Sequence, residues 1–127
     1  MAAPATQGEF MMKYMLLIYS DPALREADVD GKIMNEMIAG HMRLGADMRD
    51  AGVVYSGSQL QPVTTATTVR TEGGAQTLHD GPFAETKEQL GGYYLIDVPN
   101  LDAAIAWARR IPQPGRGSVE VRPIVER

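Results

Sequence analysis

Residues 13–19 read KYMLLIY, and this stretch decides the fold. Successive side chains of a strand point to opposite faces, and here both faces are apolar apart from the lysine at the start. Residues 93–98, YYLIDV, repeat the pattern with Asp97 as their one charged residue. A strand that is apolar on both faces needs cover on both, so we expect the two stretches to be central strands of one sheet.

Two helices are predicted outside these strands. Over residues 30–51 the apolar side chains recur every three or four positions, which predicts a helix that stops at Gly52. Its apolar stripe consists of Met34, Met37, His41, Leu44, Met48 and Ala51. Asn100 can cap a second helix that runs to Ile111. Residues 20–29 are polar and predict a variable entry to the first helix.

Weaker strand patterns complete the chain. Residues 53–60 contain glycine and serine, and residues 119–125 alternate apolar with charged side chains, so both predict edge strands. Residues 64–70 and 75–79 predict a β-hairpin around a glycine-rich turn. Residues 84–92 predict a loop with room for one helical turn.

The predicted order of elements is therefore β-α-β, a hairpin, and β-α-β. This is the split plan of ferredoxin-like α+β domains, in which the first and third principal strands are central. Both helices cover one face of such a sheet, and its apolar opposite face needs other cover. A second copy of the same sheet would supply it, so we expect a homodimer with sheet-to-sheet packing.

The composition indicates one soluble domain. The chain has 127 residues, of which 44% are hydrophobic and 22% charged. Residues 1–11 lack the features of a secretory signal and predict a loosely ordered leader before a domain at residues 12–127. The most apolar run is far shorter than the roughly 20 residues of a membrane span, so we expect a cytoplasmic protein.

Charge and residue types exclude several functions. A net charge of −4 offers no basic surface for a phosphate backbone, so direct nucleic-acid binding is not expected. The chain has no cysteine and therefore no disulfide, thiolate metal site or cysteine nucleophile. Its two histidines lack metal-ligand spacing, and no phosphate-binding glycine loop is present. We expect neither a metal nor a cofactor.

His41 is the strongest candidate for chemistry. It is the titratable residue on the apolar stripe, so its imidazole should face the sheet and act as a general acid or base. The alternative is a buried histidine satisfied by one hydrogen bond. Helix geometry places Asp50 on the opposite side of the helix from His41 and makes Asp47 unfavourable for a contact with it, so a partner of His41 must come from another segment. Asp80, in the turn after the hairpin, is the leading candidate, although aspartate before glycine is also a routine turn residue.

Three more residues are candidates for binding a small molecule. Arg122 could hold a ligand carboxylate, although its place in the last strand favours a solvated edge charge. Tyr93 belongs to a residue type that is more often found in cores and interfaces than in catalysis. Glu85 lies in a charged cluster that is usually solvated but could supply an acid beside a pocket.

The segment DGPFAETKEQLGGYYLI, residues 80–96, closely resembles the signature of DGPF-domain proteins, bacterial members of the YCII-related family. The resemblance continues at residues 13–19, 66–70 and 118–123 and covers nearly everything from Met12 onward. It implies a dimeric ferredoxin-like fold of the dimeric α/β-barrel group.

The resemblance also implies a function. YCII-related proteins are regarded as enzymes with a histidine and an aspartate in a pocket; His41 is the match to the histidine, and Asp80 or Asp50 to the aspartate. DGPF genes often lie beside genes for extracytoplasmic-function sigma factors. We therefore expect a small cofactor-free enzyme that acts on a small polar organic molecule. The alternatives are a non-catalytic ligand-binding or interaction module linked to transcription through a sigma factor, and a structural dimer, because the fold alone does not fix the function.

Overall fold

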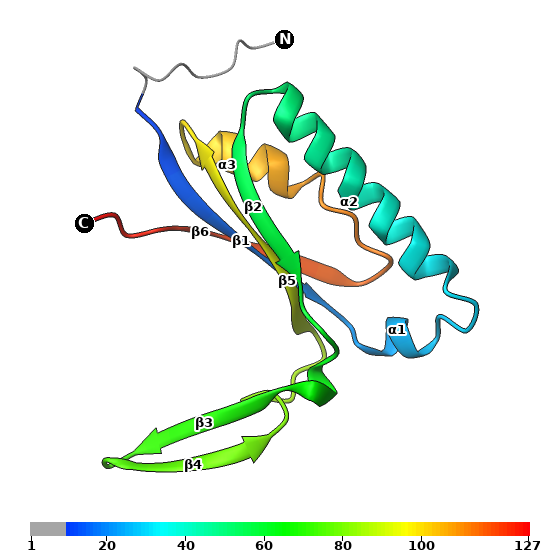
Figure 1. Cartoon of the computed structure of the whole chain (residues 1–127), viewed down its shortest axis with the longest axis vertical. Helices are drawn as coiled ribbons and strands as arrows, with labels where there is room; N and C mark the ends of the chain where they lie inside the picture. The colour runs from blue at the N-terminus through cyan, green and yellow to red at the C-terminus, as the bar shows by residue number, and fades with distance from the viewer. Residues whose placement is uncertain (1–9) are drawn as a thin grey trace.

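A four-stranded antiparallel sheet with helices on one side makes up the body of the protein (Figure 1). The computed structural model describes residues 10–127, and the leader expected at residues 1–11 lies outside the described residues except for Phe10 and Met11, which have no regular structure. The strands of the sheet are β1 (Met12–Ser20), β2 (Val54–Gln59), β5 (Gln89–Val98) and β6 (Gly117–Pro123). The helices are α1 (Ala23–Glu26), α2 (Lys32–Asp50) and α3 (Leu101–Ala108).

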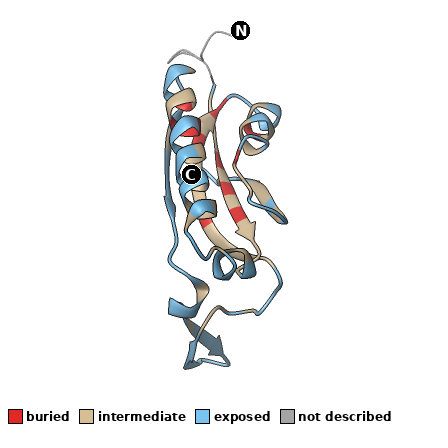
Figure 2. Ribbon diagram, turned by 90° about the vertical axis from the view of Figure 1, so that its right-hand side faces the viewer, coloured by how far each residue is buried: buried red, intermediate tan, exposed pale blue. Residues whose placement is uncertain are grey.

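The strand order is β2-β5-β1-β6, so the two strands predicted to be central are central and the two predicted at the edges are at the edges. Leu16 in β1 pairs with Tyr94 on one side and with Val121 on the other, which fixes the register. The core lies between the helices α2 and α3 and the face of the sheet that they cover (Figure 2). Its buried residues are Tyr14, Leu16, Ile18, Leu44, Met48, Ile96, Val98, Ala104 and Ile111.

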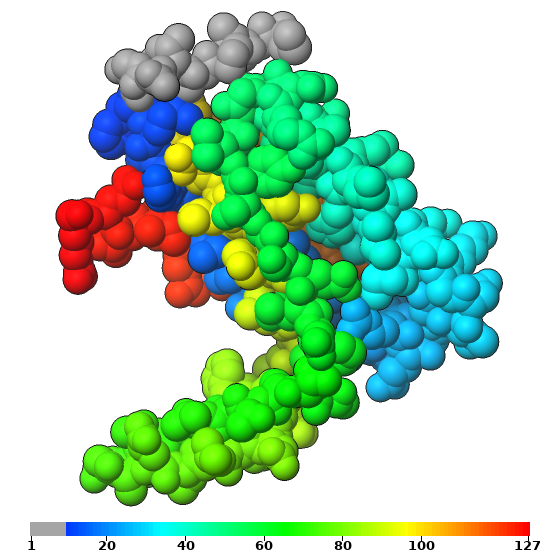
Figure 3. Space-filling model, viewed as in Figure 1, coloured from blue at the N-terminus to red at the C-terminus, as the bar shows by residue number. Residues whose placement is uncertain are grey.

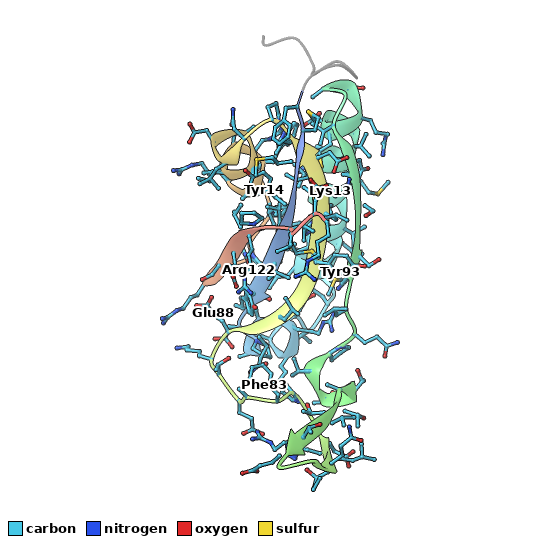
Figure 4. All side chains as sticks on the ribbon, turned by 90° about the vertical axis from the view of Figure 1, so that its left-hand side faces the viewer. Lys13, Tyr14, Phe83, Glu88, Tyr93 and Arg122 are labelled. Carbon is cyan, nitrogen blue, oxygen red and sulfur yellow. The ribbon has the colours of Figure 1, made fainter. Side chains whose placement is uncertain are left out.

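Within residues 10–127 no helix lies on the opposite face of the sheet, and we call this face the open face (Figure 4). Cross-strand register places Leu17 beside Tyr93 and Met15 beside Leu95 on this face. All four side chains are half-buried by their neighbours alone. The prediction that both faces of the central strands are apolar is therefore confirmed, but in a single chain only one face is covered.

Helix ends follow local hydrogen bonds. The Asp28 carboxylate accepts the backbone N–H groups of Ile33 and Met34, both at 2.9 Å, at the start of α2. Asn100 caps α3 as predicted, by accepting the N–H of Ala103 at 2.9 Å. The helix ends at Ala108 rather than at Ile111, which is buried in the turn that follows.

The polar entry to the helix predicted at residues 20–29 contains a short helix of its own, α1, which the sequence did not predict. Asp21 starts this helix by accepting the N–H of Ala23 at 3.0 Å, and Pro22 has the backbone angles that a helix start requires. The loop predicted at residues 84–92 is wrong in part. β5 begins at Gln89, and no helical turn forms in this segment.

The predicted hairpin forms a separate two-stranded sheet of β3 (Thr67–Glu72) and β4 (Ala75–Asp80). Gly73 and Gly74 turn the chain with φ of 57° and 83°, angles that glycine adopts without strain. β3 begins later than predicted because Val63–Thr65 form a 3-10 turn, and Asp80 ends β4 instead of lying in the following turn.

This hairpin, residues 67–80, extends away from the body on the side of the open face, and we call it the arm (Figures 1 and 3). Every residue of the arm except Thr68 is exposed. An isolated two-stranded hairpin has marginal stability in water, so the turn and the hydrogen bonds at the base of the arm must support it. At the base, Gly81 donates to the carbonyl of Ala66 at 2.7 Å and accepts the Thr68 hydroxyl at 2.8 Å.

Candidate functional site

His41 lies in the middle of α2 and makes a side-chain contact with the sheet. Its Nδ1 is 2.7 Å from the Tyr94 hydroxyl oxygen. The two rings are nearly parallel, with centroids 5.8 Å apart. Both side chains are half-buried. The stripe of α2 therefore directs the imidazole to the sheet, as the sequence predicts, and β5 supplies its partner.

Tyr94 has room for its ring because the adjacent strand contains Gly57. A Cβ atom at that position would lie 2.8 Å from Tyr94 Cδ1 and 2.5 Å from the carbonyl oxygen of Tyr93. Such distances are too short for carbon, so any larger residue would displace the tyrosine or the strand. The glycine that weakens β2 as a strand is thus what allows Tyr94 to reach His41.

A second tyrosine extends this arrangement along the same layer. The Tyr55 ring lies 6.2 Å from the Tyr94 ring, measured between centroids. Arg49 donates from Nη1 to the Tyr55 hydroxyl at 2.7 Å. Gly45 in α2 leaves space for that hydroxyl, since a Cβ there would lie 2.5 Å from it. We call His41, Tyr94, Tyr55 and Arg49 the polar row between α2 and the sheet.

The environment keeps both partners of the central contact neutral. Burial lowers the pKa of His41 below its ordinary value. Burial is the larger cause that raises the pKa of Tyr94, and the electrostatic interaction with Tyr55 raises it as well. At neutral pH an uncharged imidazole therefore faces a protonated phenol. Such an imidazole has one N–H and one lone pair, and the bond to Tyr94 decides which nitrogen carries each.

Asp80 is not a contact of His41 in this chain. It lies at the end of β4 in the arm, where its backbone pairs with Thr67, and its side chain is exposed. Within residues 10–127 no hydrogen bond or ion pair joins the two residues. The pairing of His41 with Asp80 stays a prediction.

The other candidates lie elsewhere. Tyr93 and Arg122 are on the open face, with the sheet between them and the α2 side where His41 lies (Figure 4). The Arg122 guanidinium donates from Nε to Glu120 at 2.6 Å, so its nearest anion belongs to its own strand. Glu85 is exposed in the loop before β5. The structure therefore does not gather the predicted site residues at one place.

Tyr94 is the residue that sequence reasoning missed. Residues 93–94 are adjacent tyrosines, and tyrosine is more often found in cores and interfaces than in catalysis, so the sequence gives no direct sign of a role for Tyr94. Alternation along β5 separates them, because Ile96 and Val98 are buried against the helices and Tyr94 shares their face. That alternation, combined with a histidine on the sheet-facing side of α2, was the signal available in the sequence.

Among residues 10–127 no group of three or more histidine, aspartate or glutamate side chains could hold a metal ion. In the same range no helix is long and apolar enough to cross a membrane. Within residues 10–127, side-chain hydrogen bonds bring two titratable residues of α2 against the sheet, His41 against Tyr94 and Arg49 against Tyr55.

Comparisons with known proteins agree with the extent of this domain. The family model described as the YCII-related domain matches residues 12–127. An uncharacterized protein of Rhizobium meliloti (strain 1021) is 39% identical over 118 residues, which cover 89% of this chain and 92% of that protein. The matched region contains the whole sheet, the three helices and the arm.

Proposed function

This chain belongs to the YCII-related domain family, and from that premise we propose that it is a small acid–base enzyme in which His41 transfers a proton. The observation that carries the proposal is the 2.7 Å contact between His41 Nδ1 and the Tyr94 hydroxyl. A catalytic base must be neutral and oriented at the working pH, and this contact together with burial meets both requirements. Its substrate would be a small polar organic molecule, because the imidazole is only half-buried and can be reached from solvent.

The proposal specifies the tautomer of His41. In the working form Nδ1–H donates to the Tyr94 oxygen, which leaves the lone pair on Nε2 free to accept a proton from the substrate. Tyr94 is then a positioning residue, comparable to the groups that orient metal-ligating or catalytic imidazoles through their other nitrogen. The opposite arrangement, with Tyr94 donating to Nδ1, would place the hydrogen on Nε2 and make His41 a donor.

We also keep Asp80 as the proposed carboxylate partner of His41, although it lies on the arm and outside the polar row. The arm extends on the open-face side, across the sheet from His41, so a contribution from Asp80 would not be a direct contact within one chain (Figure 1). This expectation is separable from the role of His41, because Asp80→Asn would alter turnover without altering the His41–Tyr94 contact in a single chain.

Proton abstraction can be tested without knowing the natural substrate. We would incubate the full chain in D₂O with pyruvate, oxaloacetate and acetoacetate and follow exchange of their α-protons by NMR. The parent and His79→Gln should accelerate exchange over buffer, and His41→Gln should not. His79 is the matched control because it is the other histidine of the chain and is exposed on the arm. Buffer-level exchange for every compound would overturn carbon-acid chemistry at His41.

The second candidate is a ligand-binding or interaction module linked to transcription through a sigma factor. One observation favours it: apolar side chains are exposed on and beside the arm. Val69 and Leu78 form a cross-strand pair that is 58% and 75% exposed, and Phe83 near the base of the arm is 78% exposed. Surfaces of this kind suit a protein partner. Binding of an extracytoplasmic-function sigma factor that is lost in Leu78→Asp, with no proton exchange at His41, would favour this function.

We also infer a ferredoxin-like homodimer of the dimeric α/β-barrel group, with the DGPF segment at residues 80–83, in the bacterial cytoplasm. The supports are the β2-β5-β1-β6 order, the two helices on one side, and the half-buried apolar open face. The relative from Rhizobium meliloti supports the bacterial origin. Sedimentation of the parent as a dimer, and of Leu17→Asp as a monomer, is the expected result.

A further inference from the structure

The arm has one face with an apolar pair and one polar face. Alternation along its strands puts Val69 and Leu78, which pair across the hairpin, on the same face. The other face carries Thr68, Arg70, Thr77 and His79. Val69 is 58% and Leu78 75% exposed, on a hairpin whose strands have marginal stability by themselves. Two large apolar side chains side by side in water indicate a surface that a partner covers.

The open face of the sheet lies on the same side of the molecule as the arm. The arm leaves the body between β2 and β5 and extends on this side (Figure 1). Figure 3 shows a hollow between the arm and the body. The apolar centre of the open face consists of Met15, Leu17, Tyr93 and Leu95. A partner that fills the hollow would therefore contact both the open face and the arm.

The length of the arm fits a second sheet in this position. Each of its strands has six residues, which at about 3.4 Å per residue gives an arm of about 20 Å. Two sheets that pack face to face lie about 10 Å apart. The arm is therefore long enough to pass a sheet stacked on the open face and to contact the layer behind it.

The charges on the open face favour a second copy as the occupant. Lys13 lies 3.5 Å from Asp97 and 3.7 Å from Glu126. Arg122 pairs with Glu120 on the neighbouring part of the same face. In β1, β5 and β6 the face thus has two cations and two anions that neutralise each other. A two-fold interface brings a surface against itself, so a face without net charge avoids the repulsion that a strongly charged face would suffer.

We propose that the arm of each copy packs against the side of a second copy of this chain, so that the partner covers Val69 and Leu78. The inference rests on the homodimer proposed above and adds the arm to its interface. Two-fold symmetry gives each copy both roles, so the two arms enclose the paired sheets. Sheet-to-sheet packing without the arms would leave both apolar pairs in water.

Sedimentation equilibrium of the full chain measures the dissociation constant of the dimer. Leu78→Thr and Val69→Thr keep a residue that favours strands and remove apolar surface. Each should raise the dissociation constant about tenfold or more, because a symmetric dimer loses the contact twice. His79→Thr is the matched control, since His79 is next to Leu78 and lies on the polar face of the arm. It should change the constant less than about twofold.

A second measurement detects the contact itself. The chain has no cysteine, so one spin label can be attached at Glu72→Cys, at the far end of the arm. Spin-labelled copies with natural nitrogen are mixed with ¹⁵N-labelled copies, so that any broadening of amide signals arises between chains. The label on the arm should broaden signals of the partner. A label at Glu36→Cys, exposed on α2, should not.

The outcomes separate the role of the arm from the homodimer on which it rests. A parent that sediments as a monomer overturns both. A dimeric parent in which the label at position 72 broadens no partner signals overturns the role of the arm and leaves sheet-to-sheet packing in place. Equal dissociation constants for Leu78→Thr and His79→Thr overturn the role of the arm as well, and would leave the exposed pair free for a different protein.

Discussion

Replacement of Tyr94 by phenylalanine removes one hydroxyl group and keeps the ring that stacks on His41. The bond that is lost spans 2.7 Å between half-buried groups. A neutral hydrogen bond of this kind contributes about 1 kcal/mol to the free energy of unfolding, and partial access to water keeps the loss from being larger. We expect a loss of about 1 kcal/mol, or about 4 °C in melting temperature.

The matched control is Tyr93→Phe in the same strand. The Tyr93 hydroxyl lies on the open face and makes no side-chain hydrogen bond within residues 10–127. Its removal should change the free energy of unfolding by less than about 0.5 kcal/mol. Urea unfolding of the parent and the two variants measures both values. Equal losses in Tyr93→Phe and Tyr94→Phe would mean that the contact with His41 contributes no stability.

The same variant tests the tautomer that catalysis requires. If Nδ1–H donates to Tyr94, the phenol oxygen favours the imidazolium, since a charged donor makes the stronger bond. Loss of the phenol should then lower the pKa of His41 further below its ordinary value, where burial already holds it. NMR titration of the two histidines measures this directly, with His79 as an internal reference. A rise in the pKa of His41 would show that Tyr94 donates to Nδ1, and would refute the role of Nε2 as a base.

Three further predictions concern stability. The pKa of His41 is lowered in the folded chain, so the unfolded chain binds the proton first as pH falls through the ordinary histidine value, and the parent should lose stability there. Urea unfolding from about pH 8 to about pH 5 measures this loss, which should be smaller in His41→Gln. Gly57→Ala should cost about 2 kcal/mol by forcing a Cβ against Tyr94, and the neighbouring exposed change Ser58→Ala should be nearly neutral by the same unfolding assay. Asn100→Ala should cost about 1 kcal/mol and reduce the helix signal in circular dichroism, because α3 loses its N-terminal cap.

The central strands illustrate what a sequence pattern can predict. Residues 13–19 and 93–98 are apolar on both faces, and only a central strand can cover both, so their place in the sheet followed from side-chain alternation alone. The hairpin and the Asn100 cap were predicted for similar reasons. In each case the cause lies within a few residues of the effect, such as a glycine pair at a turn or an amide oxygen beside a helix start.

The early start of β5 shows where a local sequence pattern is insufficient to predict a strand. Residues 89–92 contain two glycines, which favour a loop by themselves. In the structure Gly92 is buried and pairs with Ile18 and Gln59, so the neighbouring strands extend β5 through it. A Cβ at Gly92 would lie 3.1 Å from the carbonyl oxygen of Ser58, so the glycine suits the close approach of β2.

The sequence by itself determined the α+β class, the order of the strands along the chain, and the orientation of His41 toward the sheet, because these depend on residues that are near one another in the chain. Only the tertiary structure decided that Tyr94, 53 positions away, is the partner of His41, and that Asp80 lies on an arm apart from it. The physical reason is that a contact between a helix and a sheet depends on how the two elements pack, and on glycines such as Gly57 that leave space for a neighbouring side chain. The periodicity of side chains within either element does not encode this packing.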